Sequence, residues 1–428
     1  MKTNLYAVCY VALSAPAIAQ EAPPTQTVFF EKDPQIQPDL LLNQPSINKP
    51  TSAPVKEGSS IEESINLAIV SKDWQKLEEL LNQYRTTPNF DLTLYDYGLG
   101  ALYRHQGRQK EAIALYQQIL KRQPDLHYPR FDLAMMLYED KRYAEAKTQL
   151  ETAKPYLAPP LQALVNQLLS SIKKSQEWQP TLNFSYESTD NVNQASDLKE
   201  LVIGEATFIR SDESLPQDAN GIRYNIGVGQ EKNIKGNHYI YKDAGLGGVN
   251  YWDNHDYSEL TLHTNLGYRY KDIKQSWGVI TRIEQNLLGG SQYNQNYAAT
   301  LEYNRQLSNQ WQISGSLSHL QKRYEDDNLA SYYDGHANST AWIVLYQPQP
   351  KWLVYGGADF TRDDLSDKAE SSDRQGIRGG MAFSGEQINI RSSLRYAQRD
   401  FWADNFFYGK KREDDEYQFS TTIGHKRL

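Results

Sequence analysis

The chain has almost no cysteine and no long apolar run. Its 428 residues include a single cysteine, Cys9, which excludes internal disulfides and sites built from several cysteine ligands. After residue 20 no apolar run approaches the roughly 18 residues of a membrane-spanning helix. A net charge of −8 argues against nucleic acid as a partner. Metal-ligand spacings, nucleotide loops and nucleophile motifs are also missing, so we expect no metal, no cofactor and no enzymatic activity.

The N-terminal segment has the pattern of a secretory signal. A basic residue, Lys2, precedes a mostly apolar stretch, and Ala17-Ile18-Ala19 forms a small-x-small cleavage site. We therefore expect a signal peptide over residues 1–19. Residues 20–60 are rich in proline and polar side chains, which predicts an extended linker without a core of its own.

A helical period and an internal repeat of 34 residues follow, and we assign residues 61–175 to a tetratricopeptide-like helical domain. Small residues recur where the two helices of a unit approach each other, and aromatic residues recur beside them. Gly107 is placed to make the turn between helices and Pro124 to end the second helix. Because each unit needs neighbours to bury its core, about three units and a capping helix form a small solenoid.

The first helix of each unit lines the concave face of such a solenoid, and this face is the predicted client-binding groove. An aromatic groove that contains arginine suits an extended peptide. The alternative is that some of these side chains pack against a neighbouring helix. The residues that the repeat register places in the groove are Tyr97, Arg104, His105, Tyr128, Phe131 and Tyr138.

From residue 178 to 428 the period changes to two, and about twelve alternating segments are separated by turns or polar loops. Tyrosine is abundant, with 30 residues, as in the aromatic girdles of outer-membrane barrels. The sequence thus predicts an α+β multidomain chain, a helical solenoid followed by an antiparallel outer-membrane β-barrel. Long connections are expected near 193–219, 289–294, 324–335, 363–373 and 400–412, alternating with short turns.

The alternation also predicts which side chains face the barrel interior. A charged side chain that faced lipid would cost about 2–4 kcal/mol near mid-bilayer, so the register is strongly specified. The predicted interior is polar and of mixed sign. Its charged members and one histidine are Arg223, Glu259, His263, Arg269, Arg282, Glu284, Glu302, Arg378, Arg391 and Arg395.

The combination of signal, linker, repeats and strands resembles the surface lipoprotein assembly modifier (Slam) family. The resemblance rests on the repeat from Gly107 to Pro124, on the phrase Tyr186–Asn193 at the end of the first strand, and on Asn220-Gly221-Ile222. It implies a barrel of fourteen strands that ends in an aromatic residue. Here about twelve strands are found and the chain ends in Leu428, which suggests either a barrel truncated by two strands or a smaller one.

The resemblance also implies a function, namely translocation of surface lipoproteins or related soluble cargo from the periplasm to the cell surface. The helical domain would be periplasmic, and the protein a monomer in the outer membrane. Its partners would be a lipoprotein client, membrane lipid, periplasmic chaperones and the outer-membrane insertion machinery. The alternative is an exopolysaccharide exporter, in which the solenoid binds other proteins and the polymer threads the barrel.

Overall fold

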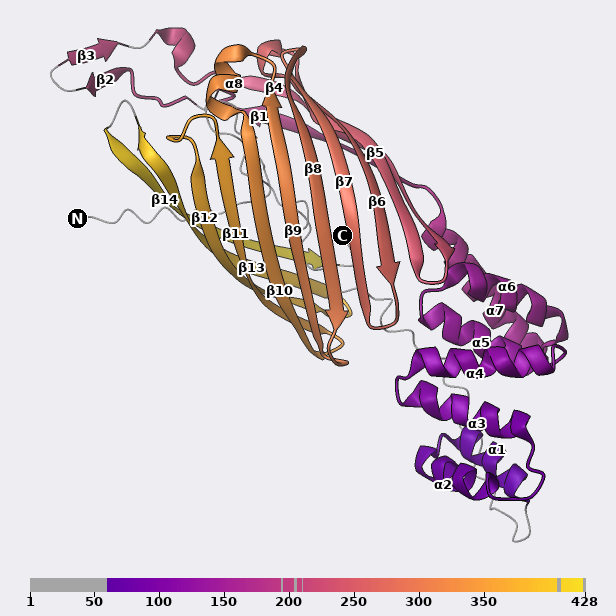
Figure 1. Cartoon of the computed structure of the whole chain (residues 1–428). Helices are drawn as coiled ribbons and strands as arrows, with labels where there is room; N and C mark the ends of the chain where they lie inside the picture. The colour runs from indigo at the N-terminus through magenta and orange to yellow at the C-terminus, as the bar shows by residue number, and fades with distance from the viewer. Residues whose placement is uncertain (1–59, 194, 204–205, 210, 406–408, 426–428) are drawn as a thin grey trace.

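A computed structural model describes residues 60–425, except 194, 204–205, 210 and 406–408. A helical domain extends from one end of a large curved antiparallel sheet (Figure 1). The expected signal peptide and nearly all of the expected linker lie outside the described residues. No helix among the residues described is long and apolar enough to cross a membrane.

The helical domain consists of three helix pairs and a final helix. Asp73 and Asp91 cap the second and third helices by accepting hydrogen bonds from backbone N–H groups of the first turn. Pro159 and Pro160 begin the final helix, where a missing N–H carries no penalty. The pairs are α1 (Ile61–Ser71) with α2 (Trp74–Tyr84), α3 (Leu92–His105) with α4 (Gln109–Arg122), and α5 (His127–Glu139) with α6 (Tyr143–Ala153); α7 (Pro159–Gln176) follows.

Small residues permit the close packing within the pairs. A Cβ atom added to Gly100 would lie 2.5 Å from the ring of Tyr116, so glycine is required for α3 to approach α4. The turns between paired helices place Lys72, Gly107 and Lys141 in the left-handed region, with φ values of 58°, 71° and 62°. Only one of these three equivalent positions is glycine, the residue that adopts this conformation without steric cost.

Twelve strands form the large sheet, and each pairs with its neighbours along the chain in antiparallel register. They are β1 (Gln179–Thr189), β4 (Ala219–Lys235), β5 (His238–Tyr251), β6 (Glu259–Lys271), β7 (Gln275–Leu288), β8 (Ser291–Gln306), β9 (Trp311–Tyr324), β10 (Gly335–Gln349), β11 (Trp352–Leu365), β12 (Ser372–Ser384), β13 (Ile388–Asn405) and β14 (Lys410–His425). Among the described residues β1 and β14 are not paired, so they form the two edges of the sheet.

The connections at the end of the sheet away from the helical domain differ from the expected loops at two places. The 289–294 segment is instead a tight turn: Gly289 and Gly290 both have positive φ, and β8 begins at the next residue. The 400–412 segment is largely strand, because β13 continues to Asn405 and β14 begins at Lys410. The first loop contains a hairpin of β2 (Glu200–Ile203) and β3 (Ala206–Ile209), and the β9–β10 loop contains α8 (Asp327–Tyr333).

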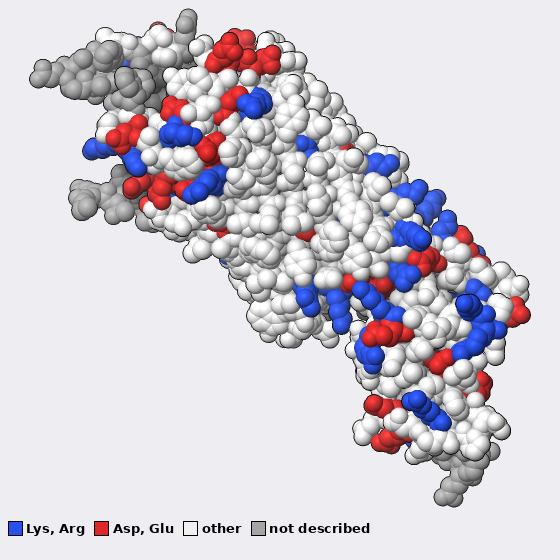
Figure 2. Space-filling view, viewed as in Figure 1, with Lys and Arg blue, Asp and Glu red and all other residues white. Residues whose placement is uncertain are grey.

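The two faces of the sheet differ in polarity, as the alternation predicts. Leu266 and Ile283 are more than half exposed on the outer face, as expected for side chains that meet lipid. Figure 2 shows a broad uncharged band across the outer wall, while charged side chains gather toward its two ends and on the helical domain. The strand arrangement, the polar inner face and this apolar band identify the sheet as the wall of an outer-membrane barrel.

Candidate functional site at the junction of the helical domain and the barrel

The helical domain is attached to one part of the barrel rim. The start of α6 and the end of α7 contact the last residues of β4, and the start of α6 also contacts the β4–β5 turn. The α5–α6 turn contacts both the β4–β5 turn and the β6–β7 turn. The turn between α3 and α4 approaches the same rim, since a Cβ atom on Gly107 would lie 3.4 Å from Nζ of Lys274. We call this set of contacts the junction.

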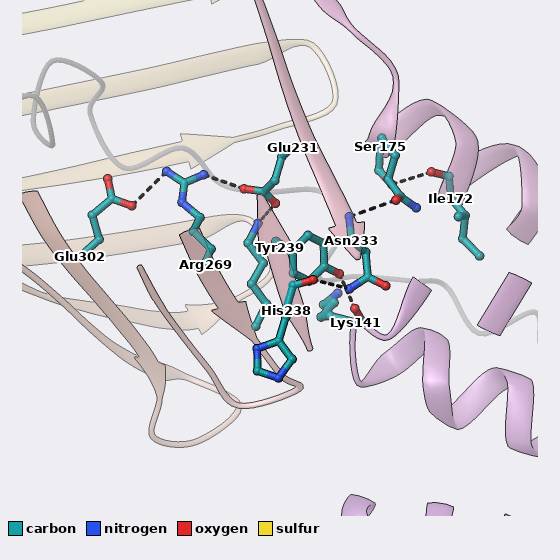
Figure 3. Close-up of polar contacts among 11 residues, drawn as sticks. Lys141, Ile172, Ser175, Glu231, Asn233, His238, Tyr239, Arg269 and Glu302 are labelled. Carbon is teal, nitrogen blue, oxygen red and sulfur yellow. Dashed lines mark hydrogen bonds and ion pairs between the residues drawn. The ribbon is translucent and has the colours of Figure 1, made fainter. Parts of the chain in front are cut away.

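Asn233, near the end of β4, takes part in four hydrogen bonds of the junction (Figure 3). Its Oδ1 atom accepts a hydrogen bond from the backbone N–H of Ala144 at 2.8 Å, and its own N–H donates to Oε1 of Gln176 at 3.1 Å. Its Nδ2 atom donates to the carbonyls of Gly236 and His238, which fixes the conformation of the β4–β5 turn. With 3% of its surface exposed, Asn233 joins two helices and a turn through buried bonds.

A second asparagine, Asn237, links the turn to Asp140. Its Nδ2 atom donates to the carbonyl of Asp140 at 2.6 Å and to the carbonyl of Lys271 at 2.7 Å. The carboxylate of Asp140 also accepts from Nδ2 of Asn237 and from the N–H of Ile273, at 3.3 and 3.4 Å. Burial raises the pKa of Asp140, and the hydrogen bond from Asn237 partly opposes that shift.

Ion pairs continue from the junction into the barrel interior (Figure 3). Lys271, whose ammonium lies 5.2 Å from the ring centre of Tyr239, pairs with Glu231. Glu231 pairs with Arg269 at 2.6 Å, and Arg269 pairs with Glu302 at 3.0 Å. The junction and the inner wall of β4–β8 therefore form one connected polar structure.

The structure places three of the predicted groove residues in contacts between repeats. The hydroxyl of Tyr97 donates to Asp132 at 2.7 Å, and burial is the main reason why the pKa of Tyr97 is raised. Arg104 forms an ion pair with Glu139, although its side chain is 34% exposed. The ring of His105 stacks on Trp74 at 4.6 Å between centroids. These side chains join successive helical units, which is the alternative that the sequence left open.

The other three predicted groove residues differ in exposure. Phe131 and Tyr138 are each 8% exposed and belong to the main hydrophobic core, and the hydroxyl of Tyr138 lies 3.0 Å from that of Ser171 on α7. The prediction that Phe131 and Tyr138 line an open groove is thus wrong, because their rings fill the space between α5 and its neighbours. Tyr128 is 53% exposed and is the accessible member of these three residues.

The predicted interior residues lie mostly in ion pairs on the inner wall. Arg223 pairs with Glu187, His263 with Asp243 at 3.1 Å, and Arg282 with Glu284 at 2.5 Å. Glu259 lies near Arg223, and Arg378 and Arg395 both contact Asp359. Arg391 takes part in no ion pair in the part of the chain that the structure describes, and its buried Nε atom has no hydrogen-bond partner.

Sequence reasoning missed several acidic partners and one arginine of the interior. Asp359, Glu231, Glu187 and Arg374 all lie at inward positions of their strands. The signal was available for Asp359, since it alternates with apolar Ala358 and Phe360, whose positions face outward. The sequence of one strand does not show that the carboxylate of Asp359 lies within hydrogen-bonding distance of Arg378 and Arg395 on β12 and β13.

The barrel region, residues 178–428, matches the family described as surface lipoprotein assembly modifier. The chain belongs to this family. Residues 55–150 match the N-terminal repeats of the same family. The family match covers the barrel and most of the helical domain, and therefore includes most of the junction.

Several relatives match over more than nine-tenths of the chain, and two of them illustrate the range of names. One, from Pasteurella multocida, is named surface lipoprotein assembly modifier and is 24% identical over 95% of this chain and 82% of its own length. The other, from Acinetobacter baumannii, is named hemophilin secretion modulator and is 25% identical over 93% of this chain and 84% of its own length. Among solved structures, CdiB from Acinetobacter baumannii is 12% identical, with a TM-score of 0.32 over 57% of this chain and 48% of its own.

Proposed function

We propose that this outer-membrane protein moves surface lipoproteins, or related soluble cargo, from the periplasm to the cell surface without enzymatic chemistry. The observation that carries the proposal is membership of the surface lipoprotein assembly modifier family over the whole barrel region. The relative named hemophilin secretion modulator supports the extension to other cargo.

The placement of the helical domain supports a periplasmic orientation. The domain attaches at the rim where the strands are joined by short turns such as Gly236-Asn237, whereas a 29-residue connection between β1 and β4 lies at the other rim. Outer-membrane barrels have short turns on the periplasmic side and long loops outside. The solenoid would therefore meet the client before the client reaches the barrel.

The junction gives this arrangement a mechanical basis. Buried hydrogen bonds at Asn233 and Asn237 hold the helical domain beside the barrel rim, so a client held by the solenoid stays close to the barrel wall. No nucleotide is available outside the inner membrane, so we propose that folding of the client at the surface drives transport. Periplasmic chaperones that deliver the client, and the insertion machinery that places the barrel, are further proposed partners of a monomer.

The test is surface display of lipoproteins encoded beside this gene. They are co-expressed with and without the full chain, and their exposure on intact cells is measured by protease accessibility, with total lipoprotein as the reference. Display that depends on the chain supports the proposal. Display that does not depend on the chain contradicts it, and loss of a secreted polysaccharide instead would favour the exporter.

A control follows from the positions of the groove residues. Tyr97 and Arg104 hold helical units together, so their replacement changes folding as well as client contact. Tyr128 is exposed, and Tyr128→Ala leaves those contacts intact. Loss of display in Tyr128→Ala, with an unchanged helical circular dichroism signal, would place client contact on the solenoid.

A further inference from the structure

The inner wall of the barrel is polarised by charge. On β1 and β4–β8 the interior carries more carboxylates than cations, whereas β12 and β13 carry arginines in excess. The first group comprises Glu187, Glu231, Asp243, Glu259, Glu284 and Glu302 against Arg223, Arg269, Lys271 and Arg282. The second comprises Arg374, Arg378, Arg391, Arg395 and Arg399, with Asp359 of β11 and Asp414 and Glu416 of β14 as their acidic neighbours.

We call Arg374, Arg378, Arg391 and Arg395 the arginine cluster. Arg378 lies directly opposite Arg395 in the β12–β13 register, an arrangement of like charges that is unfavourable without a counter-charge between them. That counter-charge is Asp359, which accepts from Nη2 of Arg378 at 3.0 Å and from Nη2 of Arg395 at 2.9 Å.

Local sequence makes this contact possible. Arg395 reaches Asp359 across β12, and it passes over Gly376, where an added Cβ atom would lie 3.0 Å from both Nη2 of Arg395 and Oδ2 of Asp359. With its side chain only 3% exposed, Asp359 is enclosed by guanidinium groups. One carboxylate thus serves two arginines at hydrogen-bonding distance.

The remaining arginines of the cluster are poorly compensated. Arg374 reaches Asp359 and Glu416 only at 4.0 and 3.8 Å, and Arg391 has no ion pair among the described residues. The buried Nε atoms of Arg374, Arg391 and Arg395 have no hydrogen-bond partner. A buried polar group without a partner is costly, and guanidinium groups preferentially take carboxylates and phosphates as partners.

We infer that the arginine cluster is a binding site for carboxylate groups of a polypeptide segment inside the barrel. The inference rests on the proposed function, because it takes the client in transit as the source of those carboxylates. Arg378 and Arg395 lie near the middle of β12 and β13, whereas Arg374 is the third residue of β12 and Arg391 the fourth of β13. All four lie at inward positions of their strands, and lipid meets the outer face of a barrel, so the interior is where a ligand reaches them. An acidic segment of a client polypeptide inside the barrel does reach the arginine cluster.

The experiment measures binding of a fluorescent octaglutamate peptide to the purified full chain in detergent, by fluorescence anisotropy, with octaglutamine as the uncharged probe. We expect the glutamate peptide to bind and the glutamine peptide not to bind. We also expect binding to weaken steeply as salt rises to about 0.5 M, because screening weakens partly exposed charge pairs.

Two variants locate the site. Arg391→Gln removes a cation that has no ion pair among the described residues, and Arg374→Gln removes one whose ion pairs are long. Both changes keep the hydrogen bonds that Arg378 and Arg395 donate to Asp359. Together they should weaken octaglutamate binding about tenfold or more, which is the loss expected for one or two charge-assisted contacts. The matched control is Arg282→Gln on β7, which changes another inward arginine of the barrel wall and should weaken binding less than about twofold.

Three outcomes would overturn the inference. Equal binding of octaglutamine shows that charge is not recognised, and equal losses in Arg282→Gln and the double variant show that the cluster is not the site. Competition by inorganic phosphate at the same concentration as the peptide shows a site for small free anions. Failure of the display assay with intact octaglutamate binding would contradict the proposed function but leave the carboxylate site in place.

Discussion

The hydroxyl of Tyr239, on β5, donates a hydrogen bond to the backbone carbonyl of Lys141, in the turn between α5 and α6. Lys141 adopts a left-handed conformation with φ of 62°, and Tyr239 is 2% exposed. A residue in an unfavourable backbone conformation is thus held at the point where helices and barrel meet. The junction is a packed interface, and it can be tested residue by residue.

Asn233→Ala should loosen the junction. The change removes the acceptor of the Ala144 N–H and the donor to two carbonyls of the β4–β5 turn, at about 1–3 kcal/mol for each buried group left without a partner. Hydrogen–deuterium exchange should become at least about tenfold faster at Ala144, as expected for a loss of 1.4 kcal/mol or more.

The matched control for this change is Asn309→Ala. Asn309 is exposed in the β8–β9 turn at the same rim, and the hydrogen bonds of the junction among the described residues do not involve it. Exchange at Ala144 and lipoprotein display should be unchanged in this variant. Equal exchange in Asn233→Ala and the wild type would show that the junction does not depend on Asn233.

Gly100→Ala should destabilise the helical domain by about 1–3 kcal/mol, the usual effect of overpacking. The added methyl group would lie 2.5 Å from the ring of Tyr116, which is 3% exposed and cannot move without disturbing the core. Thermal unfolding followed at 222 nm measures the effect. Gly356→Ala on β11, where the nearest atom lies 3.9 Å away, is the control and should leave this transition unchanged.

Lys72→Gly should stabilise the helical domain. Lys72 has φ of 58°, which strains any residue with a Cβ atom, and glycine removes that strain for a gain of about 0.5–1 kcal/mol. Gly107→Ala, at the equivalent position of the next unit, should have the opposite effect. Chemical denaturation measures the free energy of unfolding, which should rise in Lys72→Gly and fall in Gly107→Ala. A fall in Lys72→Gly would mean that the lysine side chain stabilises the fold by more than the backbone strain costs.

The stability of the helical domain should depend on pH through Asp132. Burial raises the pKa of Asp132 above 3.8, while Tyr97 and Arg104 oppose the shift and Glu139 adds to it. Because the folded pKa is raised, the stabilising contribution of the protonated form is present at low pH and is lost as pH rises through the folded pKa.

Asp132→Asn keeps a hydrogen-bond acceptor for Tyr97 and cannot ionise. Its melting temperature should therefore increase relative to the wild type as the pH rises from about 4 to 7. Asp125→Asn changes an exposed carboxylate, and its melting temperature relative to the wild type should stay constant over the same pH range. If the melting temperature of Asp132→Asn relative to the wild type also stays constant, ionisation of buried Asp132 is not the cause of the pH dependence.

The buried ion pair of Lys322 with Asp363 links β9 and β11 across β10, and the two side chains are 5% and 6% exposed. Lys322→Met should lower the stability of the barrel by about 3–5 kcal/mol, because it leaves a buried carboxylate without its partner. The double variant Lys322→Met with Asp363→Leu should recover most of that loss. Heat-induced shifts in gel migration measure the order of stability among the three proteins.

The fold can be predicted from the sequence to a large extent, because the alternation of polar and apolar residues and the helical repeat are regular over long segments. Period-two alternation located the twelve strands of the sheet, and the 34-residue repeat located the helix pairs. The sequence does not reveal the Gly289-Gly290 turn, because the polar residues after it resemble a loop, although they continue the ladder between β7 and β8.

The candidate site was less predictable because it depends on distances between segments. A repeat register states which face of a helix Phe131 occupies, but it does not state that a neighbouring helix covers that face. The arginines of β12 and β13 could be assigned to the inner wall one strand at a time. Their excess over nearby carboxylates became visible only when the register of β11–β14 was known.

The junction occupies one sector of the rim, at the β4–β5 and β6–β7 turns, and α1 lies at the far end of the helical domain (Figure 1). A force applied near α1 therefore acts through a long lever on one side of the barrel. It reaches β4–β7 as a torque, whereas in the described part of the chain the hydrogen bonds of the junction do not involve the wall from β10 to β14. Tension on a held polypeptide would deform the barrel asymmetrically, and would bend the wall that carries the carboxylates more than the wall that carries the arginine cluster.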